Sequence, residues 1–186
     1  MRYLYFNLKY YSILFHKNKI VKIITLKYLK LYIIYGGFLM KAKNRKVVLI
    51  GAGMVGMSFA YQLYSSGLCE ELGLIDFFAE KAEGEAMDLN HGGALVPPIK
   101  VTSGGYEQCA DADVIVIAGG LPQKPGETRL DLVDKNMKVV KDMSEQIVAS
   151  GFDGVIVIAS NPVDVLTNAL QKFTGFPRHR IVGSGT

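Results

Sequence analysis

The sequence is poor in cysteine and has no long apolar run. Only two of its 186 residues are cysteines, Cys69 and Cys109. They stand in no metal-ligand spacing and are too few for a framework of several disulfides, which favours a reducing compartment, and we expect the cytoplasm. The length suffices for one α/β domain with a sizeable core but is short for a two-domain enzyme.

Acidic residues are missing from the start of the chain. The first 39 residues hold seven of the 21 basic side chains and none of the 17 acidic ones, which leaves 14 basic and 17 acidic side chains in the remainder. The formal charge of +4 therefore originates in the first segment, and the body is mildly acidic. Because such a body lacks a basic surface, we expect no nucleic-acid partner.

Residues 1–39 also lack the features of a membrane span or an export signal. They consist almost wholly of Tyr, Lys, Ile, Leu, Phe and Asn. A transmembrane helix needs about 18 to 20 apolar residues, and lysines interrupt this stretch every few positions. Residues 31–39 approach the length of a signal-peptide core, but they lack the small-residue cleavage site.

Two interpretations of residues 1–39 stay open. One is a basic amphipathic helix on a membrane surface, because apolar residues recur at helical spacing, at Ile20, Ile23, Ile24, Tyr28 and Leu31. The other is that the segment, whose residue types A/T-rich codons encode, is translated upstream sequence and that the protein starts at Met40. We favour the second interpretation, which assigns residues 1–39 to an extension outside the fold and residues 40–186 to one domain.

Short apolar runs alternate with amphipathic stretches in the remainder. Residues 47–50, 73–75, 114–117 and 155–158 are rich in β-branched residues and too short for helices, which predicts buried parallel strands. Residues 54–66 and 129–150 are predicted helices that end at glycines, at Gly67 and Gly151. The apolar face of the second helix comprises Val133, Met137, Val140, Met143 and Ile147. This alternation predicts an α/β fold with a doubly wound parallel sheet and ligands at the carboxyl ends of its strands.

The first predicted strand runs into a glycine-spaced turn. Gly51 permits a tight turn, Gly53 lets backbone N–H groups approach a pyrophosphate, and Gly56 lets the next helix pack on the sheet. Asp76 follows 20 residues after Gly56, at the end of the second strand. Its carboxylate can accept hydrogen bonds from the ribose hydroxyls but repels a 2′-phosphate. The pattern predicts a Rossmann domain that binds NAD rather than NADP.

Polar segments follow the third and fourth strands. Residues 119–129 form a loop rich in glycine and proline, which can act as a lid at a ligand face. Its Arg129 can polarise a substrate carbonyl as hydride arrives, or it is a solvated arginine in the first helical turn. Asn161 can bind a nicotinamide ribose or a substrate oxygen, or it is the N-cap of a helix that begins at Pro162.

Five motifs resemble, in order and spacing, those of bacterial L-lactate dehydrogenases, and they occupy residues 51–56, 87–92, 122–133, 161–164 and 182–186. The resemblance covers residues 46–186 and implies a cytoplasmic NAD enzyme that interconverts pyruvate and L-lactate, usually as a homotetramer. It implies cofactor contacts at Gly51, Gly53, Val55, Gly56, Asp76, Lys81, Tyr106, Gly120, Leu121, Asp142, Ala159, Ser160, Asn161 and Ser184. It implies substrate contacts at Gln123, Arg129, Asn161 and Asp164, with Arg129 also catalytic.

Gln123 distinguishes this sequence from the similar malate dehydrogenases. In those enzymes an arginine at this place pairs with the second carboxylate of the substrate. A neutral amide cannot form that ion pair, and enclosing an unpaired carboxylate costs at least several kcal/mol. We therefore expect pyruvate as the substrate, with a malate dehydrogenase relative as the alternative.

The resemblance also implies that several catalytic groups of the family lie beyond Thr186. These are its catalytic histidine, the aspartate partner of that histidine and the arginine that binds the substrate carboxylate. His16, His91 and His179 match none of these positions. We expect the chain to be the N-terminal part of such an enzyme and inactive alone, and the alternative is a nucleotide-binding fragment without catalysis.

Overall fold

The chain divides into two compact units, Met1–Asn44 and Arg45–Thr186, each with its own sheet. The computed structural model describes five strands up to residue 41, by their backbone alone, and residues 45–121 and 126–185. Among the described residues, no helix is both long and apolar enough to cross a membrane.

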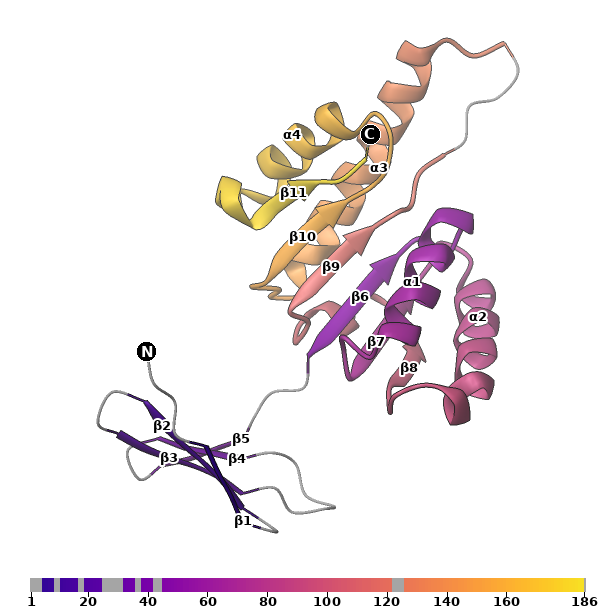
Figure 1. Cartoon of the computed structure of the whole chain (residues 1–186). Coiled ribbons are helices and arrows are strands. Elements are labelled where there is room, and N and C mark those ends of the chain that lie inside the picture. The colour runs from indigo at the N-terminus through magenta and orange to yellow at the C-terminus, as the bar shows by residue number, and fades with distance from the viewer. Residues whose placement is uncertain are drawn as a thin grey trace. The chain divides into compact units, whose positions relative to one another are not determined.

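The first unit contains a five-stranded antiparallel sheet whose strands follow one another in sequence order (Figure 1). They are β1 (Tyr5–Leu8), β2 (Tyr11–His16), β3 (Lys19–Ile24), β4 (Tyr32–Tyr35) and β5 (Phe38–Lys41). Because Ile20, Ile23 and Ile24 belong to strand β3, the surface-helix interpretation is wrong for these residues, and isoleucine favours a strand. Tyr28 and Leu31 lie outside the described residues.

The second unit contains a six-stranded parallel sheet in the order β11-β10-β9-β6-β7-β8. Its strands are β6 (Lys46–Ile50), β7 (Glu71–Ile75), β8 (Lys100–Ser103), β9 (Val114–Ile117), β10 (Val155–Ile158) and β11 (Ile181–Gly183). The chain proceeds outward from β6 to β8 and then returns to β9 on the other side of β6. This order confirms the predicted doubly wound sheet and sets its switch point between β6 and β9. Because every pairing is parallel, all strands of this sheet end at the same edge, which we call the carboxyl edge; the arrowheads of β6, β9 and β10 point to it in Figure 1.

Four α-helices and three short 3₁₀ helices connect the strands. They are α1 (Met54–Ser66), α2 (Ala79–His91), η1 (Gly92–Leu95), η2 (Tyr106–Cys109), α3 (Arg129–Ala149), α4 (Val163–Thr174) and η3 (Arg178–Arg180). The predicted bounds of α1 are confirmed, and Gly67 ends it in a left-handed conformation at φ 65°. The other predicted helix, α3, ends one residue earlier than expected.

Two apolar layers enclose the sheet because its strands alternate between them. Val48 and Ile50 of β6 pack with residues of α3 and α4, among them Val140 and Leu166. Leu49, between them, packs in the other layer with residues of α1 and α2. Burial on both faces explains why the strands are continuous apolar runs. The helices thus cover both faces, and the carboxyl edge remains for a ligand.

Candidate functional site

The glycine turn after β6 is fixed by steric contacts. Gly51 has φ 105°, and a Cβ there would lie 2.4 Å from the backbone nitrogen of Gly119. A Cβ on Gly56 would lie 1.9 Å from the carbonyl oxygen of Gly51. No larger side chain fits at either position without moving backbone, so these contacts explain both glycines.

Gly53 differs from the other two glycines of this turn. A Cβ at Gly53 would have no neighbouring atom within 4 Å. Gly53 is the N-cap of α1 and forms no side-chain cap hydrogen bond, while the next residue, Met54, is 91% exposed. The first backbone N–H groups of a helix have no partner within it, and the space around Gly53 leaves room for an anionic pyrophosphate to approach them. The residues present fit the phosphates of a dinucleotide.

Asp76 connects the end of β7 to this turn. Its Oδ2 accepts a hydrogen bond from the backbone N–H of Ala52 at 2.7 Å, and its Oδ1 accepts one from that of Phe78 at 3.0 Å. A carboxylate can accept about four hydrogen bonds, so capacity remains for ribose hydroxyls. The sequence predicted a ribose contact for Asp76, and the structure adds that the same carboxylate holds the glycine turn.

Two buried polar side chains hold the loop after β9. The Oδ1 of Asn136 accepts a hydrogen bond from the backbone N–H of Leu121 at 2.8 Å, and its Nδ2 donates to the carbonyl oxygen of Leu121 at 3.4 Å. Ser160 Oγ donates to the carbonyl oxygen of Gly119 at 2.6 Å. Sequence reasoning missed Asn136. A polar residue between Val133 and Val140, beside the apolar face of a predicted helix, was the available signal.

Tyr106 and Asp142 are two predicted cofactor contacts that lie close enough to interact. Burial, then the charges of Asp142 and Cys109, raise the pKa of Tyr106 to about 12. The Tyr106 hydroxyl therefore stays protonated at neutral pH and can donate a hydrogen bond. Asp142 accepts a hydrogen bond from the side chain of Gln146 at 2.9 Å.

The remaining described cofactor candidates lie at the carboxyl edge or in the first turn of the helix that follows it. Val55 is exposed in α1, and Lys81 is exposed in α2. Ala159 and Ser160 directly follow β10, and Ser184 directly follows β11. The structure therefore gathers residues far apart in sequence along one edge. Their contacts with a cofactor stay predictions.

The substrate candidates are described only in part. Gln123 lies outside the described residues, and Arg129 is described by its backbone as the first residue of α3. A capping box fixes this helix start, since the side chain of Thr128 accepts from the N–H of Asp131 and the carboxylate of Asp131 accepts from the N–H of Thr128. Hydrogen bonds from the Thr128 side chain and backbone lower the pKa of Asp131. Arg129 thus follows a well-defined cap.

The N-cap interpretation of Asn161 is wrong. Helix α4 begins at Val163, and its N-cap is Pro162, which has no side-chain cap hydrogen bond. Asn161 precedes the cap, is exposed, and is joined to Pro162 by a cis peptide bond. The helix begins one residue later than the interpretation required. Asn161 and Asp164 therefore remain candidates for ligand contact at this edge.

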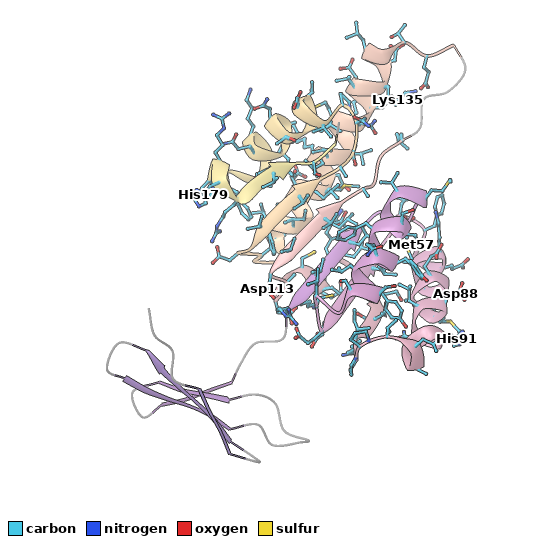
Figure 2. The ribbon with its side chains drawn as sticks, viewed as in Figure 1. Met57, Asp88, His91, Asp113, Lys135 and His179 are labelled. Carbon is cyan, nitrogen blue, oxygen red and sulfur yellow. The ribbon has the colours of Figure 1, made fainter. Side chains whose placement is uncertain are left out.

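In the second unit, both histidines lie away from the carboxyl edge and both cysteines are buried. His91 ends α2 and His179 lies in η3, in segments that lead to the starts of β8 and β11 (Figure 2). Cys69 and Cys109 are free and buried, and burial raises the pKa of both thiols, that of Cys109 to about 12. The thiols therefore stay protonated and unreactive. Among residues 45–121 and 126–185, no group of His, Cys, Asp and Glu could hold a metal ion.

Comparisons with known proteins match the second unit. The family described as lactate/malate dehydrogenase, NAD binding domain, matches residues 45–183. The L-lactate dehydrogenase 1 of Lactococcus lactis subsp. cremoris is 52% identical over 144 residues, which are 77% of this chain and 44% of that protein. The L-lactate dehydrogenase of Macrococcus caseolyticus is 55% identical over 147 residues, 78% of this chain and 47% of that protein.

A solved structure gives the same result. The minor L-lactate dehydrogenase from Enterococcus mundtii, in its ligands-bound form, superposes with a TM-score of 0.75 at 48% sequence identity. The match covers 76% of this chain and 46% of that one. The chain spans about half the length of the curated relatives that it matches.

Proposed function

Because the chain belongs to the lactate/malate dehydrogenase family, through its NAD-binding domain, we propose that it is part of an L-lactate dehydrogenase. Such an enzyme transfers hydride between NAD and a small 2-keto acid, and we propose pyruvate as that acid. The observation that carries the proposal is the arrangement at the switch point, where Gly53 opens the start of α1 and Asp76 holds the turn. The proposal includes a cytoplasmic homotetramer.

Each half of the carboxyl edge has a separate task in this proposal. The turn at Gly53 holds the pyrophosphate, Asp76 accepts from the adenosine ribose, and Gly120 with Asn161 contacts the nicotinamide half. When bound, the nicotinamide supplies or accepts the hydride. A single acidic side chain at Asp76 also repels the 2′-phosphate of NADP.

Arg129 and Gln123 define the substrate in the proposal. The guanidinium of Arg129 binds the carbonyl oxygen and stabilises the negative charge that develops as hydride arrives. Gln123 provides an uncharged wall where pyruvate has a methyl group, so no carboxylate is left without a partner. Neither His91 nor His179, the two histidines of the second unit, lies at the carboxyl edge, so the proposal assigns the proton donor to no described residue of that unit.

Two measurements on the purified chain test the proposal. NADH binding, followed by the change in NADH fluorescence, is expected with a preference for NADH over NADPH, and its absence would overturn the proposal. Pyruvate-dependent oxidation of NADH is measured in parallel. Turnover supports the dehydrogenase directly, whereas NADH binding without turnover supports the alternative of a nucleotide-binding chain without catalysis.

The substrate is tested by the change Gln123→Arg. An arginine can pair with the second carboxylate of oxaloacetate, so the ratio of kcat/KM for oxaloacetate to that for pyruvate should rise at least tenfold. Where turnover is absent, the same variant is compared by binding of oxaloacetate and pyruvate to the NADH complex. An unchanged preference between the two keto acids would refute pyruvate specificity through Gln123.

A further inference from the structure

The buried polar side chains of the second unit form two groups. Ser144 and Thr174 donate to carbonyl oxygens of their own helices, one turn earlier, at Val140 and Leu170. Asn136, only 3% exposed, instead bonds to a loop 15 residues away in sequence. A buried amide that leaves its own helix to bond with a loop fixes the position of that loop.

The amide of Asn136 matches the peptide group that it meets. Its oxygen accepts from the N–H of Leu121 at 2.8 Å, and its nitrogen donates to the carbonyl oxygen of the same residue at 3.4 Å. The two hydrogen bonds satisfy both the N–H and the carbonyl group of Leu121. This residue lies in the loop after β9, where neither group can pair within the sheet. An aspartate could accept from the N–H but not donate to the carbonyl, and an alanine could do neither.

The loop held by Asn136 lies directly against the glycine turn. Ala118 donates to the carbonyl oxygen of Ile50 at 2.9 Å, and the space for a Cβ on Gly51 is occupied by Gly119. A Cβ on Gly120 would lie 3.3 Å from the Oδ1 of Asn136, so this loop packs tightly on the amide as well. Asn136 therefore sets the second side of the switch point, as Asp76 sets the first.

We propose that Asn136 is a positioning residue for the nicotinamide half of the cofactor. It holds the backbone of Gly120 and Leu121 at the switch point. There the cofactor would cross from strands β6 to β8, which carry Asp76, to strands β9 to β11. The inference rests on the proposed function, because it uses the cofactor contacts predicted for these two residues. Asn136 itself needs no contact with the cofactor.

The experiment separates the two halves of the ligand. NADH reaches across the switch point, whereas AMP requires only the half at Asp76. Asn136→Ala is expected to weaken NADH binding about tenfold and to leave the dissociation constant of AMP unchanged within twofold, both measured by titration calorimetry. Tenfold corresponds to about 1.4 kcal/mol.

The matched control is Ser144→Ala. Ser144 is buried in the same helix and bonds only within it, so its replacement is expected to alter neither NADH nor AMP binding. Unchanged NADH binding in Asn136→Ala, or equal weakening of NADH and AMP, would overturn the inference. The second result would indicate a general structural role.

A second variant keeps the test decisive if Asn136→Ala does not fold. Asn136→Asp preserves the size of the side chain and the bond to the N–H of Leu121 but loses the donation to its carbonyl oxygen. The same selective loss of NADH affinity is expected. If the unchanged chain binds AMP but not NADH, the proposed function fails, and this result is distinct from any outcome of the variants.

Discussion

The two edges of the parallel sheet are held by different interactions. At the amino edge, the guanidinium of Arg45 pairs with Glu70 at 2.7 Å, and Glu70 also accepts from the backbone N–H of Arg45. Asp113, which directly precedes β9 and is labelled in Figure 2, accepts from the backbone N–H of Lys46 at 2.9 Å. At the carboxyl edge, Asp76 and Asn136 also bond to backbone groups, but these groups belong to the loops that a ligand meets.

The polar side chains at the two edges differ in their exposure to solvent. The side chains of Arg45 and Glu70 are 59% and 42% exposed, so solvent screens their attraction. Asn136 and Ser160 are almost fully buried, and each would leave an unsatisfied backbone group if it were removed. The amino edge therefore contributes small increments of stability, whereas the carboxyl edge uses buried polar groups to fix the loops that a ligand meets.

The largest expected effect is that of Gly51→Ala, at the centre of the carboxyl edge. The added methyl group would overlap the backbone of Gly119 at 2.4 Å, in a residue whose φ of 105° already disfavours a side chain. We expect a loss of about 3 kcal/mol or more in the free energy of unfolding, together with loss of NADH binding. Urea denaturation and NADH fluorescence measure the two effects.

Gly84→Ala is the control for that change. Gly84 lies inside α2, and a Cβ there would have no neighbour within 4 Å. Because alanine is the better helix former, this variant is expected to gain about 0.5–1 kcal/mol of stability. If the two glycine variants lost the same stability, the steric account of the turn would be wrong.

A medium effect is expected for Asp76→Asn. An asparagine offers one oxygen where Asp76 uses both to accept from the N–H groups of Ala52 and Phe78, so either the turn or the ribose loses a hydrogen bond. NADH should bind about tenfold more weakly, and the discrimination against NADPH should narrow because the repelling charge is gone.

Asp88→Asn serves as the matched control for Asp76→Asn. Asp88 is exposed on α2 (Figure 2), so the same change in charge is expected to leave both affinities within twofold of the unchanged chain. A fall in NADH affinity of similar size in both variants would indicate a general effect of net charge. The hydrogen bonds of Asp76 would then have no special part in binding.

The sequence was most informative where the signals were local. The apolar runs of β6, β9 and β10 and the glycine that ends α1 depend on adjacent residues. The bounds of β9, β10 and α1 were predicted correctly, and β6 begins one residue earlier than predicted. Helix α2 was not predicted because two of its three buried residues are alanines, Ala82 and Ala86, which give a weak apolar pattern. Strand β8 buries only Val101, so it lacks the apolar run of a central strand.

The parts of the candidate site that were predicted are those whose residues form a recognisable motif in the sequence. The glycine turn and Asp76 carry a recognisable spacing, whereas the partner of Asn136 is a loop that only the folded chain brings near it. The start of α4 was misplaced by one residue because Asn161 and Pro162 together are typical of a helix start. Contacts between distant segments were therefore the part that the sequence could not supply.

The smallest expected effect belongs to the amino edge and to the change Glu70→Gln. The hydrogen bond from the Arg45 side chain holds the pKa of Glu70 below its ordinary value. Since the pKa is lower in the folded state, the ionised pair stabilises the fold above the unfolded-state pKa, about 4.3, and this contribution disappears as the pH falls through the folded value. At pH 7 we expect the Tm of Glu70→Gln to lie no more than about 3 °C below that of the unchanged chain.

The pH and salt dependence of that difference sharpen the comparison of the two edges. The Tm difference should close as the pH is lowered through the folded-state pKa of Glu70, and it should shrink in about 1 M salt because ions screen exposed charges. Glu145→Gln, which breaks an exposed pair with Lys141 at 3.9 Å within α3, should change the Tm even less. A Tm difference for Glu70→Gln that persisted after protonation of Glu70 and in high salt would mean that the amino edge, like the carboxyl edge, depends on hydrogen-bond geometry rather than on screened charge.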